Sequence, residues 1–541
     1  MANKSKFQAI KGTRDLLPPE TALWNRVEQT AREIFATFHF GEIRSPIFEP
    51  TELFARAVGG ESDIVGKEMY TFEDHLLPGL EKDRQELLEA AETPQGLVDF
   101  ESDLDIFLSR LNRAQADGDL DSANSNLVNQ LSKLREDVDF NRLIGGGPET
   151  VEQLANELAS AMDLVRRIDL GNLLSLRPEA TASVCRAYIE HSMQQLPQPV
   201  KLYYIGPMFR RERPQKGRYR QFYQIGAEVL GGQDAPALDA EVIEMLMTFF
   251  DKLNLKGLEL DINSIGHNAE NCRQAYVAKL REELGRISTR LGEDSARRID
   301  TNPLRVLDSK VQSEQALIET LPKIADYICD DCKTHYAAVK TQLQLRGIIY
   351  RENWRLVRGL DYYMRTTFEI TAKGLGSQNA VCGGGRYDGL VEQLGGPPTK
   401  GIGFAIGEDR LILSLQDQAR EAAEAPCVAG SEIPSSVTAD QSPLLIHQSP
   451  LIFIAWMGHN TYATAVRAAK DLRNAGFPVE VPPSELKFGK ALGQADRLGA
   501  QFALILGENE VSEGMWTLKN LADGNQIKLT EPELINHLRA L

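Results

Sequence analysis

Long hydrophobic runs are missing from this sequence of 541 residues. A membrane-spanning helix needs about 18 or more consecutive apolar residues, whereas the most hydrophobic stretches, 451–457 and 502–507, have only the length of strands. The first segment, MANKSKFQAIKGTRDLLPPE, has no apolar stretch after its lysines, so it lacks the pattern of a secretory signal. We therefore expect a cytoplasmic protein with no membrane partner.

Cysteine and positive charge are also scarce. Six cysteines in a chain of this length are too few for a disulfide framework, and we expect reduced thiols. The 77 acidic residues against 60 Lys and Arg leave a net charge of −17. That balance excludes a generally basic nucleic-acid coat protein and a polybasic membrane binder, although a local basic groove is compatible with it.

Several common catalytic signatures are absent as well. The sequence has no HExxH zinc helix, no GxSxG elbow, no Walker A loop and no GxGxxG after a strand. If the protein acts on a nucleotide, it must therefore bind it through a different motif. An apolar content of 42% is enough to fill the two to four domains that this length predicts.

Changes in composition and in the pattern of strand-like and helix-like segments predict where the domains lie. Residues 1–75 and 169–416 mix strand-like and helix-like segments, including an amphipathic helix over 21–38 and a helical appendage at about 266–345. Residues 417–448 are rich in Ala, Ser and Pro and are interpreted as a linker. Residues 449–541 alternate strands with helices and predict a small α/β domain.

The segment 76–168 has a different composition. It contains 19 acidic residues against 9 Lys and Arg, with no Cys, His, Trp or Tyr. Leucines recur at helical spacing in 127–134 and 151–164. We predict an acidic helical insertion, the alternative being a mobile acidic segment.

A strongly basic loop stands out within this acidic protein. The stretch FRRERPQKGRYR at 209–220 contains five arginines and one lysine between two strand-like segments, 200–205 and 222–230. Arginine forks match phosphate oxygens in a bidentate way, so such a hairpin suits a polyphosphate or a nucleic-acid end. A merely solvated hairpin is the alternative, and the shaping residues Pro207 and Gly217 favour the functional interpretation.

Three further motifs carry polar groups in short stretches. LRPEAT places Glu179 and Thr181 just before a helix, where they suit either a helix cap or a ligand for a substrate ammonium. RGLDYY sets a cation, a carboxylate and two phenols together from Arg358 to Tyr363, and Gly383–Gly385 allow close approach of a ligand. Arg410, at a strand-to-helix junction, suits an anion or a surface salt bridge.

The pair Cys329-x-x-Cys332, followed by His335, has part of the spacing of a zinc site. A fourth ligand is not evident, and Cys272 is distant in the sequence. We interpret these residues as buried thiols and assign no metal to protein side chains.

Taken together, the motifs closely resemble the histidyl-tRNA synthetase family of class II aminoacyl-tRNA synthetases. The resemblance covers residues 7–75, about 169–415 and about 450–541. It rests on ordered motifs: FQAIKGTRDLLPPE, RSPIFEPTELFARAVG, LSLRPEATA, YYIGPMFRRERPQKGRYRQFYQIGAEVLG, LVRGLDYYMRTTFEI, GGGRYDGLVEQLGG and GIGFAIGEDRL. It implies an α+β fold with a six-stranded antiparallel sheet flanked by helices, a C-terminal α/β anticodon-binding domain, and a homodimer with Pro46 at the interface.

The resemblance also implies an activity and its residues. ATP, as its Mg²⁺ complex, would convert L-histidine to histidyl-adenylate, and tRNA(His) would then accept the histidyl group; no tightly bound cofactor is expected. Arg358 and Arg210 would hold the α-phosphate from opposite sides. The remaining ATP contacts would be Glu212, Phe222 and Arg410. The histidine contacts would be Glu179, Thr181, Gln224, Glu228, Tyr362 and Tyr363. Gln215 would face the acceptor end of the tRNA.

Three features depart from the family pattern. Ala180 stands where glycine is usual, Asp409 stands where glutamate is common, and the insertion 76–168 replaces what is a short hairpin in most relatives. A noncatalytic paralogue that serves as a regulatory subunit of ATP phosphoribosyltransferase is the main alternative. A tRNA- or protein-binding module with a relict active site is another. The arginine-rich loop, Arg358, Arg410 and the C-terminal domain favour the active synthetase.

Overall fold

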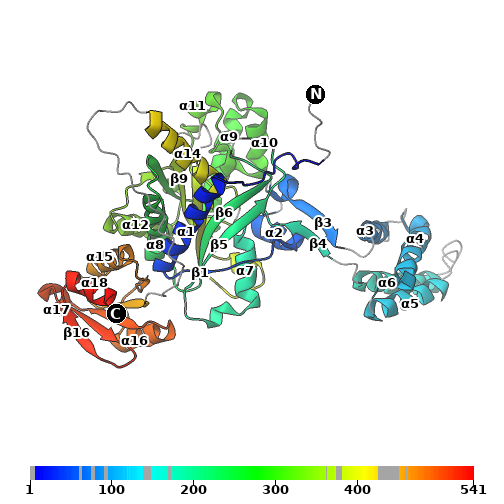
Figure 1. Ribbon diagram of the computed structural model, residues 1–541. Helices are drawn as coiled ribbons and strands as arrows, with labels where there is room; N and C mark the ends of the chain where they lie inside the picture. The colour runs from blue at the N-terminus through cyan, green and yellow to red at the C-terminus, as the bar shows by residue number, and fades with distance from the viewer. Residues whose placement is uncertain are drawn as a thin grey trace. The chain divides into compact units, whose positions relative to one another are not determined.

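The computed structural model describes residues 7–59, 64–74, 79–90, 96–117, 120, 122–137, 148–168, 172–215, 217–360, 362–372, 380–424, 450–458 and 460–540. The chain divides into two compact units (Figure 1). The larger comprises Met1–Ile47, Leu53–Met69 and Arg177–Leu541, and the smaller comprises Phe48–Glu52 and Tyr70–Leu176. None of the described helices is long and apolar enough to cross a membrane.

An eight-stranded sheet forms the centre of the larger unit, in the order β1-β5-β6-β11-β10-β9-β7-β8. Its strands are β1 (Gly41–Glu42), β5 (Val200–Phe209), β6 (Gln221–Leu230), β7 (Leu258–Ser264), β8 (Arg351–Glu352), β9 (Met364–Ala372), β10 (Ala380–Arg386) and β11 (Gly401–Gly407). The six central strands are antiparallel to their neighbours, which confirms the predicted fold class. The edge strands β1 and β8 pair in parallel and have two residues each, too short to give a pattern in the sequence.

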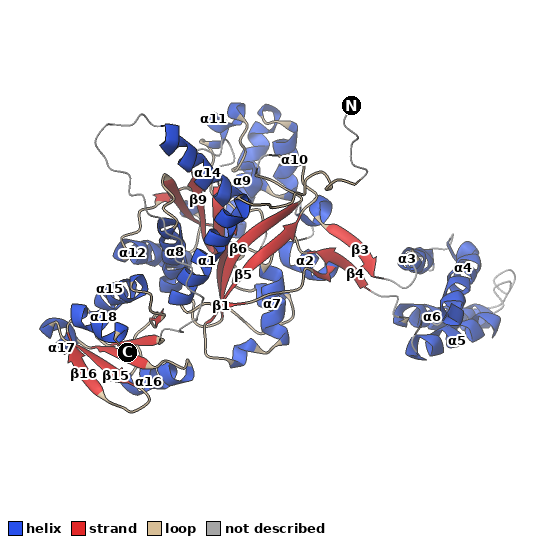
Figure 2. Ribbon diagram, in the orientation of Figure 1, coloured by secondary structure: helices blue, strands red, loops and turns tan. Residues whose placement is uncertain are grey.

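Helices cover the sheet because successive strand residues face opposite sides. Tyr203 belongs to the apolar cluster that contains α1 (Glu20–Thr37) and α8 (Pro236–Lys252), whereas the next residue, Tyr204, belongs to the cluster that contains α7 (Thr181–Glu190). Helix α1 buries Trp24, Val27, Ala31 and Phe35 at helical spacing. Figure 2 shows these helices around the red strands of the sheet.

Further helices belong to the same unit. The appendage after β7 contains the π-helical turn η4 (Glu270–Gln274), α9 (Ala275–Ile287), α10 (Glu293–Thr301), α11 (Gln315–Ile318) and α12 (Asp330–Leu345). Short helices α2 (Thr51–Val58) and α13 (Leu390–Gln393) also occur. Helix α14 (Glu408–Glu424) extends beyond residue 416, so the first residues of the predicted linker are helical instead; the rest of that linker lies outside the described residues. Gln418 anchors this extension, since its Nε2 donates to the carbonyl of Asn254 and its Oε1 accepts from the N–H of Lys256, both at 2.8 Å.

The smaller unit contains the helices predicted for the acidic insertion. They are α3 (Leu80–Ala90), α4 (Gly96–Asp117), α5 (Ser122–Asp137) and α6 (Pro148–Arg167). Their apolar faces share one buried cluster with Phe100, Phe107 and Leu131 at 0% exposure. The unit also has a small antiparallel sheet of β2 (Phe48–Pro50), β4 (Asn172–Leu176) and β3 (Tyr70–Asp74). The insertion therefore has its own hydrophobic core.

The last ninety residues form an α/β domain around a five-stranded sheet, in the order β13-β12-β14-β15-β16. The alternating half follows the sequence pattern: β12 (Ile452–Trp456), α15 (Thr461–Asn474), β13 (Val479–Glu480), α16 (Phe488–Arg497) and β14 (Phe502–Leu506). The final part adds an antiparallel hairpin and two helices: α17 (Glu508–Glu513), β15 (Trp516–Asn520), β16 (Gln526–Leu529) and α18 (Glu531–Arg539).

Candidate active site

A cavity of about 290 Å³ lies over the central strands of the large sheet. Ten of the residues singled out in the sequence line it: Glu179, Thr181, Arg210, Glu212, Phe222, Gln224, Arg358, Tyr362, Tyr363 and Arg410. They come from segments up to 231 residues apart in the chain, and the antiparallel sheet brings them together. Glu228, Gln215 and Pro46 are not among the lining residues.

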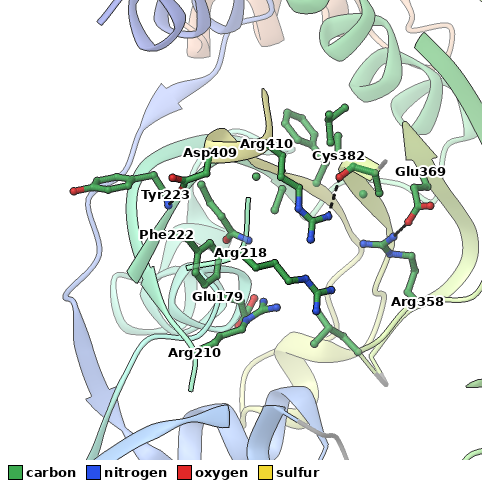
Figure 3. Close-up of a pocket in the computed structure, with 18 of the residues that line it drawn as sticks. Glu179, Arg210, Arg218, Phe222, Tyr223, Arg358, Glu369, Cys382, Asp409 and Arg410 are labelled. Carbon is green, nitrogen blue, oxygen red and sulfur yellow. Dashed lines mark hydrogen bonds and ion pairs between the residues drawn. The ribbon is translucent and has the colours of Figure 1, made fainter. Parts of the chain in front are cut away.

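Four carboxylates, of Glu179, Glu212, Glu369 and Asp409, line the cavity together with four arginines. Figure 3 shows the arginine side chains around the same space: Arg210, Arg218, Arg358 and Arg410. Arg210 donates from Nε to the carbonyl of Pro178 at 2.9 Å, and Arg410 donates from Nη1 to the carbonyl of Ala380 at 2.9 Å. Burial, together with the neighbouring Arg218, lowers the pKa of Arg410. Such a cluster is stabilised by a bound polyanion.

Arg358 is held by one carboxylate and by the shape of the sheet. Its Nη1 donates to Glu369 on β9 at 2.8 Å, and its buried Nε has no hydrogen-bond partner among the described residues. A Cβ atom added at Gly383 on β10 would lie 2.1 Å from Arg358 Nη2. The absent side chain at Gly383 therefore makes the room in which the guanidinium lies.

Glu212 connects two of the arginines in the loop between β5 and β6. Its carboxylate lies 2.9 Å from Arg218 Nη1 and 3.9 Å from Arg210 Nη1. The Arg210 guanidinium also lies over the Phe222 ring, with Cζ 5.3 Å from the ring centroid, a cation–π contact. The basic stretch of the sequence is thus a folded wall of the cavity, except that Lys216 lies outside the described residues.

Glu179 has both roles that its sequence context allowed. Its Oε2 accepts from the backbone N–H of Thr181 at 2.7 Å and its Oε1 accepts from that of Ala182 at 3.0 Å, so it caps α7. The same carboxylate lines the cavity with only 4% of the residue exposed, and burial raises its pKa. A substrate cation would stabilise its ionised form.

Acceptors and phenols line the part of the wall formed by β5, β6 and the segment before β9. Gln224 Oε1 is buried without a hydrogen-bond partner among the described residues, which marks it as an acceptor for a bound donor. Tyr362 and Tyr363 lie with ring centroids 4.7 Å apart, and burial raises the pKa of Tyr363 to about 12. These tyrosines are neutral hydrogen-bonding groups at physiological pH. Asp361, between this pair and Arg358, lies outside the described residues.

Glu228 lies behind the wall of the cavity. Thr181 Oγ1 donates to its Oε1 at 2.7 Å, and the Tyr387 hydroxyl donates to its Oε2 at 2.5 Å. The residue is 1% exposed, and burial raises its pKa to about 8. Glu228 therefore orients Thr181, which does line the cavity.

Asp409, one of the departures from the family pattern, joins two parts of the cavity wall. Its Oδ2 accepts from the backbone N–H of Tyr223 on β6 at 3.0 Å, and its Oδ1 pairs with Arg14 at 3.2 Å. A side chain of this length therefore joins the start of α14 to β6. Ala180, the other substitution, is the 0%-exposed N-cap position of α7.

The two remaining site predictions lie elsewhere. Gln215 is at the tip of the basic loop, where its backbone N–H and carbonyl both bond to Arg218 at 3.1 and 2.9 Å. Pro46 follows β1, and its carbonyl accepts from Arg177 at 3.4 Å. Neither residue lines the cavity.

The described cysteines are free thiols, as the sequence predicted, but the structure changes which residues lie beside Cys329 and Cys332. Cys272, which is distant in sequence, lies with its Sγ 3.8 Å from that of Cys332. His335 points elsewhere: its Nε2 lies 3.3 Å from Asp234 and 3.7 Å from Asp239. One helical turn separates Cys332 from His335 on α12, and the two carboxylates hold the imidazole away from the thiols.

Sequence reasoning missed several lining residues, notably Tyr204, Arg218, Glu369 and Cys382. Arg218 had a signal, because it belongs to the basic loop. Tyr204 and Glu369 lie within strands, where alternation predicts which face a residue occupies but not that the face borders a cavity.

Comparison with known proteins gives one consistent family. Residues 121–411 match the histidyl-tRNA synthetase family model, and residues 452–541 match the anticodon binding domain model. The chain is 42% identical over 537 residues to the histidine–tRNA ligase of Koribacter versatilis, covering 98% of this chain and 96% of the relative. It is 42% identical over 535 residues to that of Solibacter usitatus (99% and 99%), and 36% identical over 533 residues to that of Dehalococcoides mccartyi (98% and 99%). The acidic segment 76–168 falls within these alignments.

Proposed function

This chain belongs to the histidyl-tRNA synthetase family, and we propose that it ligates L-histidine to tRNA(His) through histidyl-adenylate, with release of AMP and pyrophosphate. The observation that carries the proposal is the cavity itself. It combines four arginines with four carboxylates, an amide oxygen without a hydrogen-bond partner among the described residues, and the buried phenols of Tyr362 and Tyr363. A polyphosphate and an amino acid are the pair of ligands that such walls complement.

ATP enters as its Mg²⁺ complex and uses the arginine side of the cavity. Arg210 and Arg358 take the α-phosphate from opposite sides, and Arg410 takes the γ-phosphate. Phe222 provides an apolar face for adenine, and Glu212 accepts from its amino group. Backbone carbonyls help to orient the guanidinium groups of Arg210 and Arg410.

Histidine uses the other side. Its ammonium is bound by Glu179, the Thr181 hydroxyl and Gln224 Oε1, all within reach of one another along β6 and the start of α7. Its imidazole lies toward Tyr362 and Tyr363. Glu228 contributes indirectly, because it accepts a hydrogen bond from the Thr181 hydroxyl and so orients it. A competing amino acid without ring nitrogens would leave buried polar groups of the pocket unpaired. Its kcat/KM would therefore be orders of magnitude below that of histidine.

The first reaction is a displacement at phosphorus. A carboxylate oxygen of histidine attacks the α-phosphorus of ATP, the bond from that phosphorus to the α–β bridging oxygen breaks, and pyrophosphate leaves with Mg²⁺. Arg358 stabilises the charge that builds on the α-phosphoryl oxygens. The 3′-terminal ribose hydroxyl of tRNA(His) then attacks the activated carbonyl, and AMP leaves.

The macromolecular contacts lie outside the cavity. The C-terminal domain, which matches the anticodon binding model, reads the anticodon, and Gln215 faces the acceptor end. Two copies associate through the segment around Pro46. The cytoplasm is where its tRNA substrate is found.

The test is histidine-dependent exchange of pyrophosphate into ATP by the purified chain without tRNA, run against a panel of other amino acids. We expect exchange with histidine alone. Histidine binding without exchange would contradict the proposal and favour the noncatalytic regulatory paralogue.

Arg358→Ala should reduce exchange by at least about 10²-fold, the cost of losing one preorganised charge donor. Arg420→Ala is the matched control, because Arg420 is an exposed arginine of α14 that pairs with Asp417 at 2.7 Å. Near-normal exchange by Arg358→Ala would contradict the role of Arg358 while leaving the proposed activity in place.

A further inference from the structure

Three thiols and an imidazole converge at a point outside the candidate active site. They come from separate segments: His267 from the loop after β7, Cys272 from η4, and Cys329 and Cys332 from the start of α12. Their sulfur and nitrogen atoms all lie within 4.8 Å of one another. Cys272 and Cys332 are fully buried.

The separations agree with a tetrahedral metal site. Zn–S bonds of about 2.3 Å and a Zn–N bond of about 2.0–2.1 Å at tetrahedral angles imply S···S near 3.8 Å and S···N near 3.6 Å. Here Cys272 Sγ and Cys332 Sγ are 3.8 Å apart. His267 Nδ1 is 3.2 Å from Cys332 Sγ and 3.7 Å from Cys329 Sγ.

The backbone around the cluster is shaped to hold it. The N–H of Cys329 points at Cys272 Sγ from 3.4 Å, the kind of outer contact that orients a thiolate ligand. Gly266 has φ +63°, and a Cβ atom there would lie 2.8 Å from Cys272 Sγ, so the turn that delivers His267 needs a glycine. Cys329 is the N-cap residue of the 16-residue helix α12, and Cys332 is in its first turn, where the helix dipole favours thiolates.

We propose that His267, Cys272, Cys329 and Cys332 bind one Zn²⁺ in a closed structural site. Soft thiolate and imidazole ligands select zinc over Mg²⁺ or Ca²⁺. Four protein ligands leave no open position, so the ion has no catalytic water. The alternative of inert buried thiols does not explain why an imidazole and three sulfurs share one point.

The ion would join the helical appendage to the sheet and, through it, to the histidine pocket. The residue after Cys272, Arg273, donates from Nη1 to the carbonyl of Tyr363 at 2.5 Å. The residue before His267, Gly266, accepts from the N–H of Arg365 at 2.7 Å. Tyr363 lines the cavity. Loss of zinc should therefore raise the KM for histidine more than the KM for ATP.

The direct test is the metal content of the full chain purified under reducing conditions. We expect elemental mass spectrometry to find one zinc per chain. We also expect the Co²⁺-substituted protein to show the intense sulfur-to-cobalt charge-transfer bands of a tetrahedral thiolate site. Cys272→Ser and Cys329→Ser should each weaken zinc binding by more than about 100-fold, the upper range for losing an outer-shell partner alone. Cys185→Ser is the matched control, since Cys185 is a buried free cysteine outside the cluster.

His267 gives a test that a folding defect cannot imitate. His267→Cys should keep the metal and strengthen the charge-transfer bands, whereas His267→Ala should weaken binding. For the unaltered chain, a chelator should lower the Tm, and Zn²⁺ but not Mg²⁺ should restore it. Reduced protein that binds neither Zn²⁺ nor Co²⁺ stoichiometrically would overturn the proposal, as would zinc that persists in the Cys272→Ser, Cys329→Ser double variant. None of these readouts depends on the ligase activity.

Discussion

Gly383→Ala tests whether the position of Arg358 controls adenylate formation. The new methyl carbon would lie 2.1 Å from Arg358 Nη2, 2.4 Å from Cζ and 2.5 Å from Nη1. Nonbonded contacts of this kind need about 3.5 Å or more, so the guanidinium must move by at least 1 Å or so. A displacement of that size can cost about 10²-fold in rate, or roughly 2.7 kcal/mol. We expect pyrophosphate exchange to fall by this factor.

The fold should tolerate the same change. Gly383 pairs with Glu369 and Ala405 in the middle of β10 and does not have a left-handed φ. Alanine in an extended strand loses less conformational entropy than glycine, so the Tm should change little. Gly41→Ala on β1 is the control, because its nearest neighbour, Leu202 Cδ2, would be 4.0 Å from the added carbon.

A double-mutant cycle separates displacement of Arg358 from obstruction of the substrate, since Gly383 itself lines the cavity. If displacement is the cause, Gly383→Ala should have almost no further effect on exchange in the Arg358→Ala background. An equal loss in both backgrounds would refute the reasoning, because it would mean that the methyl group blocks the ligand directly.

Three other changes have expected outcomes. Glu408→Leu should raise the Tm and stabilise the protein by about 1–3 kcal/mol. Glu408 is 0% exposed, neither of its oxygens has a partner among the described residues, and burial raises its pKa to about 9. An unchanged or lower Tm would contradict this prediction. Burial raises the pKa of Glu228 to about 8, so the stability that this residue contributes is present below its ordinary pKa near 4.5 and is lost as the pH rises through 8. The Tm of Glu228→Gln relative to that of the unaltered chain should therefore increase from pH 6 to pH 8. A constant difference in Tm would exclude a raised pKa. Gln224→Leu should raise the KM for histidine by about 10-fold or more in the exchange assay and leave the KM for ATP near its original value; equal changes in both would place Gln224 outside the ammonium site.

The sequence predicted the parts of the site that are local in the chain. The basic loop, LRPEAT and RGLDYY each place several polar groups within a few residues, and such groups stay together in any fold that keeps the stretch on one side of a sheet. Strands β5 and β6 were also predicted, because they are long enough to show alternation or apolar runs. The strands β1 and β8, with two residues each, were not.

Other features depend on contacts between distant segments, which no local pattern encodes. His267 and Cys332 are 65 residues apart, and only the fold of the appendage brings them together, so spacing rules pointed to His335 instead. Glu228 differs for another reason. The family resemblance, and not a local pattern, assigned Glu228 to the histidine imidazole. Its two hydroxyl partners lie 47 and 159 residues away, so the sequence did not predict these contacts.

The way in which the arginines are held explains how an acidic protein can bind a polyphosphate. Two of them, Arg210 and Arg410, are oriented by carbonyl oxygens of Pro178 and Ala380. A carbonyl dipole aligns a guanidinium without adding a negative charge, so little reorganisation is needed when charge develops in the transition state. Arg358 has a closer carboxylate partner than Arg210, because its Nη1 lies 2.8 Å from Glu369, whereas Arg210 Nη1 lies 3.9 Å from Glu212. The α-phosphate must therefore compete with Glu369, and Glu369→Gln should tighten ATP binding while making Arg358 less well placed, lowering the KM for ATP and the kcat of exchange together. A fall in kcat without tighter ATP binding would show that Glu369 acts only by orienting the guanidinium.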